Sequence, residues 1–272
     1  MIVQHNITSM NANRQLGIVG NNLTKATEKL ASGYRVNRAA DDAAGLAISE
    51  KMRAQVRGLN RASDNAQDGI SLIQTAEGAL EQQHAILQRT RELVVQAANT
   101  GVLEQSNDND YQKIQDEIDE LEGEFTRIND QTEFNKKKLL DGSYSSQWLH
   151  IGANDKQGIA VTISKTSWTS VDVTSGAAGG STATVINTVD TMLKSVTTVR
   201  SKLGAIQNRL EYAVKVDDNA AENLQSAESR IRDTDMADEM TRFSKESILQ
   251  QAATSMLAQA NQANQGVLSL LQ

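Results

Sequence analysis

Apolar residues recur along most of this chain at alternating intervals of three and four, a spacing that places them on one side of an α-helix packed against a partner helix. Five stretches show this spacing: residues 12–30, 52–87, 114–128, 189–231 and 249–270. Asp217 interrupts the fourth stretch. At about 1.5 Å of rise per residue, that stretch alone predicts a helix roughly 65 Å long. The pattern therefore predicts long helices that pack side by side.

The composition agrees with long helices. The 272 residues include no proline, and aromatic residues make up 3% of them. A proline inside a helix removes a hydrogen bond and costs roughly 3 kcal/mol, so its absence suits uninterrupted helices. A compact globule of this length normally uses more large rings in its core. We therefore predict a mainly α fold, an elongated antiparallel helical bundle or coiled coil.

The sequence changes in character between the third and fourth helical stretches. Residues 148–151 and 159–164 have the pattern of two short strands separated by a turn rich in Gly, Asn and Asp. They predict a small β-hairpin near residues 148–164. Residues 174–184, TSGAAGGSTAT, are small and poor in apolar side chains, which predicts an exposed flexible loop.

Both ends of the chain are almost free of charge. Residues 247–272 contain no charged side chain, and within residues 1–13 only His5 could carry one. Solvated helix faces normally carry charge, so we expect the two terminal helices to pair with each other and to be buried against other protein. The side chains expected to line these terminal helices are Leu16, Val19, Leu23, Leu30, Leu249, Met256, Val267 and Leu270.

Charge and cysteine content exclude several classes of partner and site. The net charge of -7 and the pI near 5.1 argue against nucleic acid as a main partner. The absence of cysteine excludes disulfides, thiol nucleophiles and Cys-based metal sites. The N-terminal residues lack the basic and apolar regions of a cleaved secretory signal, and no stretch approaches the roughly 18 apolar residues of a membrane-spanning helix. We therefore expect neither a cleaved signal nor membrane insertion.

Two adjacent carboxylates, Asp41 and Asp42, stand in the segment RVNRAADDAAGLAIS and have two interpretations. They could serve acid–base or metal chemistry, but that needs further converging ligands, and the three histidines show no ligand-type spacing. They could instead cap the following helix, because side-chain oxygens accept hydrogen bonds from its free amides. We favour the cap, with Arg35 and Arg38 as candidate salt-bridge partners, and predict no catalytic, cofactor-binding or metal-binding residue.

Four ordered segments resemble the terminal signatures of bacterial flagellin: LASGYRVNRAADDAAGLAISEKMRAQVRGL, NAQDGISLIQTAEGALEQQHAILQRTRELVVQA, TEFNKKKLLDG and AESRIRDTDMADEMTRFSKESILQQAATSMLAQANQ. The resemblance covers nearly the whole chain and implies a subunit of the extracellular helical filament used for motility. It implies that paired terminal helices form an inner tube, inside a shell of longer helices and a hairpin. Residues 1–43 and 233–272 are then the arms of the inner domain, and residues 44–232 form the helical shaft. The short middle implies a form without large outer domains.

The resemblance also implies how the protein is exported and with what it assembles. The main partner is a further copy of the chain, and an export chaperone, a filament cap and hook-junction proteins are implied as well. Export is implied through the flagellar type III channel without a cleaved signal, and no cofactor is implied.

Two positions depart from the family pattern. Lys136 stands where glycine is usual, so Asn135 is expected to take the left-handed conformation instead, and Asn264 stands near a common proline, which predicts a straighter last helix.

The segment LQRTRELVVQA resembles the flagellin patch that packs protofilaments together and that vertebrate Toll-like receptor five recognises. The matching positions are Leu87, Gln88, Arg89 and Glu92, with Glu117 as an expected neighbour. Arg89 could be a plain surface charge, but an arginine beside an apolar stripe is a common interface anchor. We therefore predict an assembly surface here that also serves as a receptor ligand.

Two other classes of protein compete with the filament subunit. A monomeric secreted coiled-coil adhesin, or a needle-type type III export protein, would share the helical pattern but would not need charge-free ends at both termini. An enzyme is a more distant alternative, because the sequence contains no recognisable catalytic constellation. Growth of smooth filaments from short seeds separates these classes, because only a flagellin is expected to lengthen them.

Overall fold

The computed structural model describes residues 6–99, 110–174 and 181–269, and it confirms the predicted mainly α fold with a small β-hairpin. The helices are α1 (Ile7–Ser32), α2 (Ala43–Ala97), α3 (Asp110–Gln131), α4 (Ser181–Arg232) and α5 (Met236–Ser269). The strands are β1 (Glu133–Phe134), β2 (Lys137–Lys138), β3 (Gln147–His150) and β4 (Gly158–Val161).

The chain divides into two compact units. Unit 1 consists of residues 1–55 and 222–272, and unit 2 consists of residues 56–221. The divisions fall inside α2 and α4, so each of these helices contributes to both units. The assignment of residues 1–43 and 233–272 to one functional domain and of residues 44–232 to another stays a prediction.

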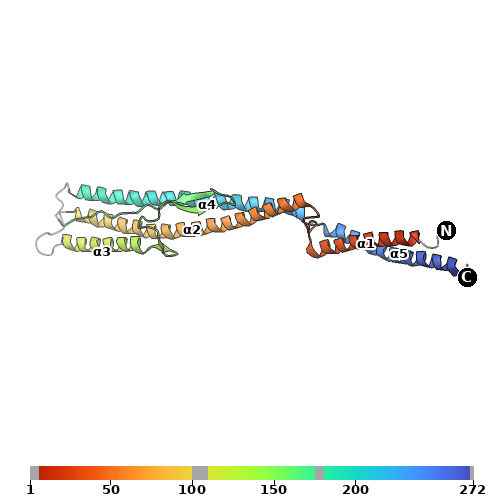
Figure 1. Cartoon of the computed structure of the whole chain (residues 1–272). Coiled ribbons are helices and arrows are strands. Elements are labelled where there is room, and N and C mark those ends of the chain that lie inside the picture. The colour runs from red at the N-terminus through yellow and green to blue at the C-terminus, as the bar shows by residue number, and fades with distance from the viewer. Residues whose placement is uncertain (1–5, 100–109, 175–180, 270–272) are drawn as a thin grey trace. The chain divides into compact units, whose positions relative to one another are not determined.

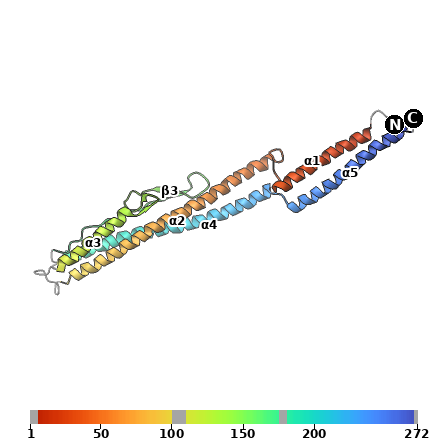
Figure 2. The same ribbon diagram turned by 90° about the horizontal axis from the view of Figure 1, so that it is seen from below.

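Unit 1 contains the predicted pair of terminal helices, in which α1 lies along α5 (Figures 1 and 2). Near the free ends of the pair, the Asn6 amide donates to the carbonyl of Ala260 at 3.0 Å, and the Ser9 hydroxyl donates to Asn261 Oδ1 at 2.7 Å. On the predicted side of α1, Ala26 is buried and Leu16, Val19, Leu23 and Leu30 are half-buried.

One side of α5 is covered and another is not. The buried and half-buried positions of α5 are Glu239, Phe243, Glu246, Ser247, Gln250, Ala253, Leu257 and Ala260. Leu249 and Met256 remain 41% and 65% exposed. That these two side chains line the terminal helices in an assembly stays a prediction, because spacing alone does not tell the side that faces α1 from the side that faces other protein. The side chains of Val267 and Leu270 lie outside the described residues.

Unit 2 is built on α2, α3 and α4. Arg91 of α2 contacts Asp190 of α4 at 2.8 Å and Glu77 contacts Arg200 at 3.6 Å, so these two helices run antiparallel. The predicted stripes form the core. Its fully buried side chains include Ile73, Leu80 and Leu87 of α2, Ile118 and Phe125 of α3, and Leu203 and Leu210 of α4.

The predicted hairpin is present in unit 2 as β3 and β4, which pair antiparallel from Gln147↔Val161 to His150↔Gly158. Leu149 of β3 packs over Gly69 of α2, where a Cβ atom would lie 2.7 Å from the leucine Cδ1. Residues 181–184 belong to α4, so the predicted loop at 174–184 is wrong for these four residues; residues 175–180 lie outside the described ones.

Candidate functional site

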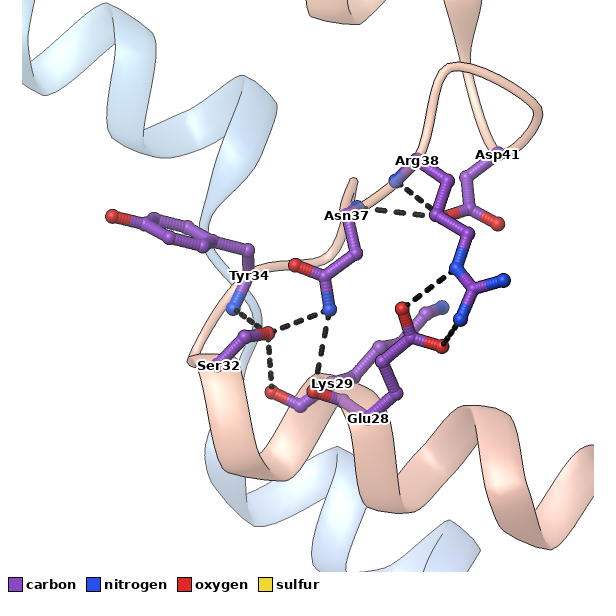
Figure 3. Close-up of polar contacts among 7 residues, drawn as sticks. All are labelled: Glu28, Lys29, Ser32, Tyr34, Asn37, Arg38 and Asp41. Atoms are coloured by element: carbon purple, nitrogen blue, oxygen red, sulfur yellow. Dashed lines mark hydrogen bonds and ion pairs between the residues drawn. The ribbon is translucent and has the colours of Figure 1, made fainter.

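The connector between α1 and α2 separates the roles of the two adjacent aspartates. Asp42 Oδ1 accepts a hydrogen bond from the Gly45 amide at 2.8 Å, and thus caps the start of α2. A Cβ atom on Gly45 would collide with this carboxylate, which accounts for the glycine. Asp41 Oδ2 accepts from the amides of Arg38 at 3.0 Å and Asn37 at 3.3 Å, so it stabilises the turn itself (Figure 3). The amide of Arg38 lowers the pKa of Asp41 below its usual value.

The ion pair of this connector joins Arg38 to Glu28 of α1. Arg38 Nε and Nη2 donate to the two Glu28 oxygens at 2.9 Å and 3.0 Å, and this contact raises the pKa of Arg38 (Figure 3). Asn37 Nδ2 donates to the Glu28 carbonyl at 3.2 Å and to Ser32 Oγ at 2.7 Å. The expected salt bridge between Arg38 and the aspartates is therefore replaced by a fork of two hydrogen bonds to Glu28, which a planar guanidinium favours.

The connector also pairs with the connector between α4 and α5, which the hydrophobic spacing did not predict. The Thr234 amide donates to the Gly33 carbonyl at 3.0 Å, and the Arg35 amide donates to the Arg232 carbonyl at 2.6 Å. Among the described residues Arg35 forms no ion pair with an aspartate, and its side chain donates to the Ile231 carbonyl at 2.6 Å.

Tyr34 belongs to the connector between α1 and α2, and two arginines lie over its ring. The Arg232 and Arg53 guanidinium carbons lie 4.7 Å and 5.9 Å from the centre of its ring. Arg53 also contacts Glu228 at 3.2 Å, and Arg232 forms an ion pair with Glu50. Cation–π contacts and ion pairs thus hold the ends of α2 and α4 that belong to unit 1 against each other.

In the predicted assembly patch on α2, Arg89 pairs with two carboxylates of the same chain. Arg89 Nε donates to Glu117 Oε1 of α3 at 2.9 Å, and Arg89 Nη1 lies 3.2 Å from Glu92 Oε2. These carboxylates, with Glu117 the stronger influence, raise the pKa of Arg89. Gln88 is exposed and hydrogen-bonded to His84, at 3.0 Å between the side-chain nitrogens. Arg89, Glu92, Glu117 and Gln88 therefore form a polar surface across α2 and α3.

Leu87 does not belong to this surface. Its side chain is 0% exposed and lies in the core of unit 2. It can support the position of Arg89 but cannot contact a further molecule while the unit is folded. The prediction that Leu87 is an interface residue is therefore wrong. Leu87 belongs to the apolar stripe of α2, and this stripe is buried in the core of unit 2.

Unit 2 also contains a buried cluster of polar side chains that the sequence did not predict. Gln83 Nε2 donates to Asn129 Oδ1 at 2.8 Å, and the Thr166 hydroxyl donates to Gln83 Oε1 at 2.8 Å. Asn129 Nδ2 completes the cluster by donating to the Thr166 carbonyl at 2.9 Å. The three residues are at most 5% exposed and come from α2, α3 and the segment after β4. Single polar residues inside helical stripes carry no sequence signal for such a cluster.

These contacts are spread along helix surfaces. Within residues 6–99, 110–174 and 181–269, no group of three or more His, Cys, Asp or Glu residues could hold a metal ion. No helix in the same described part of the chain is both long and apolar enough to cross a membrane. The long paired helices and the uncovered apolar side of α5 are typical of helical proteins that act through assembly.

Comparisons with known proteins identify the family. Residues 3–145 match the bacterial flagellin N-terminal helical region, and residues 186–271 match the bacterial flagellin C-terminal helical region. The chain is 53% identical to a flagellin of Halalkalibacterium halodurans and 49% identical to a flagellin of Bacillus subtilis, over the full length of each chain. It is also 47% identical over full length to a flagellar filament 31.3 kDa core protein of Treponema maltophilum.

This chain belongs to the bacterial flagellins, as a short form without large outer domains. It is a structural protein and not an enzyme. The crystal structure of Bacillus cereus flagellin covers 56% of this chain and 88% of its own, at 26% identity and a TM-score of 0.44, and the family assignment does not depend on it. Family membership sets aside the competing interpretations as an adhesin, a needle-type protein or an enzyme.

Proposed function

We propose that this flagellin polymerises into the extracellular filament of the bacterial flagellum, and so serves motility, by packing the uncovered side of its terminal helices against further copies of the chain. The observation that carries this proposal is the second apolar side of α5. Phe243 and Leu257 are half-buried, whereas Ile248, Leu249 and Met256 remain 66%, 41% and 65% exposed. An apolar surface of this kind on a soluble helix pair favours burial against protein.

The other helix of the pair leaves apolar residues uncovered as well. Ile7, Met10 and Ile18 of α1 are 67%, 68% and 47% exposed. Full burial of a side chain of this size contributes roughly 1.5 to 3 kcal/mol, so a few such contacts per copy stabilise an assembly substantially. Two different uncovered surfaces on one subunit suit head-to-tail contacts, which build open helical polymers when the rotation does not close.

The lack of charge on the C-terminal arm lowers the cost of burying it. Residues 247–272 contain no charged side chain, so a neighbouring copy can cover this arm without desolvating an ion. The same composition leaves the arm poorly stabilised by itself, because ordering each residue costs roughly 1 to 2 kcal/mol of backbone entropy. Folding of the arms and addition to the filament are then coupled, and an unfolded arm passes more easily through a narrow export channel.

Seeded filament growth tests the proposed surface. Leu249→Ser should slow the lengthening of short wild-type seeds, because it removes apolar area that faces away from α1. Gln251→Ser is the matched control, since Gln251 is an exposed polar residue two positions further along the same helix. The helical content of both monomers, followed by circular dichroism, should match that of the wild type. Equal growth of the two variants would remove this side of α5 from the assembly surface.

A second role, recognition by Toll-like receptor five, is favoured by the patch around Arg89. Its guanidinium is oriented by Glu117 and Glu92, so it is presented at a fixed position on the surface of α2. Arg89→Ala is expected to weaken both filament growth and receptor signalling by the loss of an anchor worth about 1 to 2 kcal/mol. Arg127→Ala, which removes another exposed arginine paired within α3, is the control. A receptor reporter assay that responds equally to the two variants would reject the receptor role.

The remaining partners follow from family membership. An export chaperone, a filament cap and hook-junction proteins are proposed partners, and export is proposed to proceed without a cleaved signal. N-terminal sequencing of protein taken from filaments should therefore begin at Met1 or Ile2. A start further along the chain would show that a leader is removed.

A further inference from the structure

Four methionine side chains are exposed on the terminal helix pair. Met10 of α1 and Met236, Met240 and Met256 of α5 are 68%, 47%, 50% and 65% exposed. The chain has no cysteine, so its thioethers are the sulfur atoms available to oxidants. All four lie in unit 1, on the helices that the proposed function assigns to assembly.

We propose that these four methionines are oxidation sites, and that a subunit carrying the sulfoxides is excluded from the growing polymer. The inference rests on the proposed function of α1 and α5. The oxidant is of the peroxide class. The thioether sulfur donates an electron pair to one oxygen of hydrogen peroxide, an S–O bond forms and the O–O bond breaks. The leaving hydroxide takes up the proton that the transferred oxygen loses, and departs as water. Sulfur is oxidised and the peroxide is reduced.

Met256 is the site at which oxidation should have the largest effect. It lies on the same uncovered side of α5 as Leu249, within a segment that contains no charged residue. A sulfoxide oxygen is a strong hydrogen-bond acceptor, whereas a thioether is nearly apolar, so its burial in an apolar contact leaves a polar group without a partner. We expect the elongation rate to fall on the order of tenfold.

Met192 of α4 supplies a reference within the same molecule. Its side chain is 5% exposed in the core of unit 2, and its sulfur accepts a hydrogen bond from the Thr169 amide at 3.2 Å. Burial and an engaged lone pair both slow attack by peroxide. The ratio of oxidation at Met256 to oxidation at Met192, read by peptide mass mapping, therefore measures the accessibility of the assembly surface.

The polymer should remove this difference in accessibility. In free subunits Met256 should oxidise far faster than Met192, whereas in filaments the two should oxidise at comparable slow rates, because neighbouring copies cover α5. Equal protection of Met256 in subunits and filaments, or equal exposure in both, would overturn the inference.

Seeded growth before and after hydrogen peroxide treatment provides the functional test. Each protein is compared with its own untreated sample, which removes any effect of substitution on basal growth. Oxidised wild type and Met192→Leu should both slow about tenfold, while the variant with Met10→Leu, Met236→Leu, Met240→Leu and Met256→Leu should keep its own untreated rate. Treatment of oxidised wild type with methionine sulfoxide reductases should restore growth.

The outcomes separate this inference from the proposed function. Failure of untreated wild type to lengthen seeds would contradict the proposed function. Normal growth of wild type that carries sulfoxide at Met256, or equal slowing of the fourfold variant, would reject the inference while leaving polymerisation intact.

Discussion

Lys136 holds a backbone conformation that lysine seldom adopts. Asn135 and Lys136 have φ values of 50° and 63°, and they form the two-residue turn between β1 and β2, because Phe134 pairs directly with Lys137. Two successive positive φ values suit this type of hairpin turn, and Asn and Gly tolerate them best. The sequence predicted the left-handed conformation for Asn135 in place of Lys136, and the turn instead requires it of both.

The strain at Lys136 can be measured directly. Lys136→Gly should raise the free energy of unfolding of unit 2 by about 1 kcal/mol, because glycine adopts positive φ without a Cβ clash. Thermal and urea unfolding of the full chain supply the measurement. Lys137→Gly, in the adjoining strand, serves as the control and should be neutral or destabilising. A lower melting temperature for Lys136→Gly would show that the lysine side chain contributes more than its backbone costs.

Asp217 is a carboxylate buried in a helical stripe. It is 8% exposed, and its Oδ2 has no hydrogen-bond partner within the described part of the chain. Burial, with a smaller contribution from Asp218, raises its pKa above the usual value. The charged form is therefore the unfavourable one. A polar residue in such a stripe can fix the register of packed helices at a cost in stability.

The raised pKa of Asp217 predicts a pH dependence with a definite sign. The cost of burying the charge is fully present above the raised pKa, and it disappears as the pH falls through that pKa toward the unfolded value of about 3.9. Asp217→Asn should therefore stabilise unit 2 at neutral pH, on the order of 1 kcal/mol, and should lose this advantage in acid. Urea unfolding across pH tests this. A constant difference at all pH values would exclude the charge as its cause.

At the scale of the elements, apolar spacing predicted the five helices but did not decide which side of α5 packs against α1. In α2, α3 and α4 the predicted stripes supply the core of unit 2. In α1 the predicted side is partly buried, although Ile7, Met10 and Ile18 stay exposed. In α5 apolar residues occur on several sides, so that Leu249 is exposed while Leu257 is half-buried. A single sequence cannot show which side a partner helix covers and which side awaits another copy.

The candidate site residues also differ in whether the sequence alone could predict their contacts. Asp42 as a cap follows from local chemistry, since the acceptor and the free amide are three residues apart. The pairing of Arg89 with Glu117 entered through a family resemblance and needs α3 to lie beside α2. The pairing of Arg38 with Glu28 depends on how the connector folds back onto α1, which hydrophobic spacing does not encode.

The buried cluster of Gln83, Asn129 and Thr166 should be a strong determinant of how α3 packs. Asn129→Ala would leave the Gln83 amide and the Thr166 carbonyl without these partners, and should cost about 2 to 4 kcal/mol of unfolding free energy. Chemical denaturation measures this cost, with Asn208→Ala on the exposed side of α4 as the control. Equal stability of the two variants would mean that water replaces the lost contacts.

For the whole molecule, the two compact units predict a separation between folding and assembly. Removal of residues 250–272 deletes most of α5 but none of unit 2. The truncated chain should keep a cooperative melt of unit 2 and should fail to lengthen seeds, because the C-terminal arm is absent. Amide exchange of the dilute full-length subunit complements this experiment. Strong protection of residues 249–269 before assembly would show that the arms fold alone, contrary to coupled folding and polymerisation.

The hydrogen-bonded connectors of unit 1 have a mechanical consequence. A rotating propeller loads its subunits in tension and torsion, and a single covalent linker would carry that load alone. Here two backbone hydrogen bonds join the two connectors. The Arg35 amide donates to the Arg232 carbonyl, and the Thr234 amide donates to the Gly33 carbonyl. Force that enters through either arm is thus divided between two polypeptide strands. Separating the two connectors requires both hydrogen bonds, and the contacts of the two arginines with the Tyr34 ring, to break together.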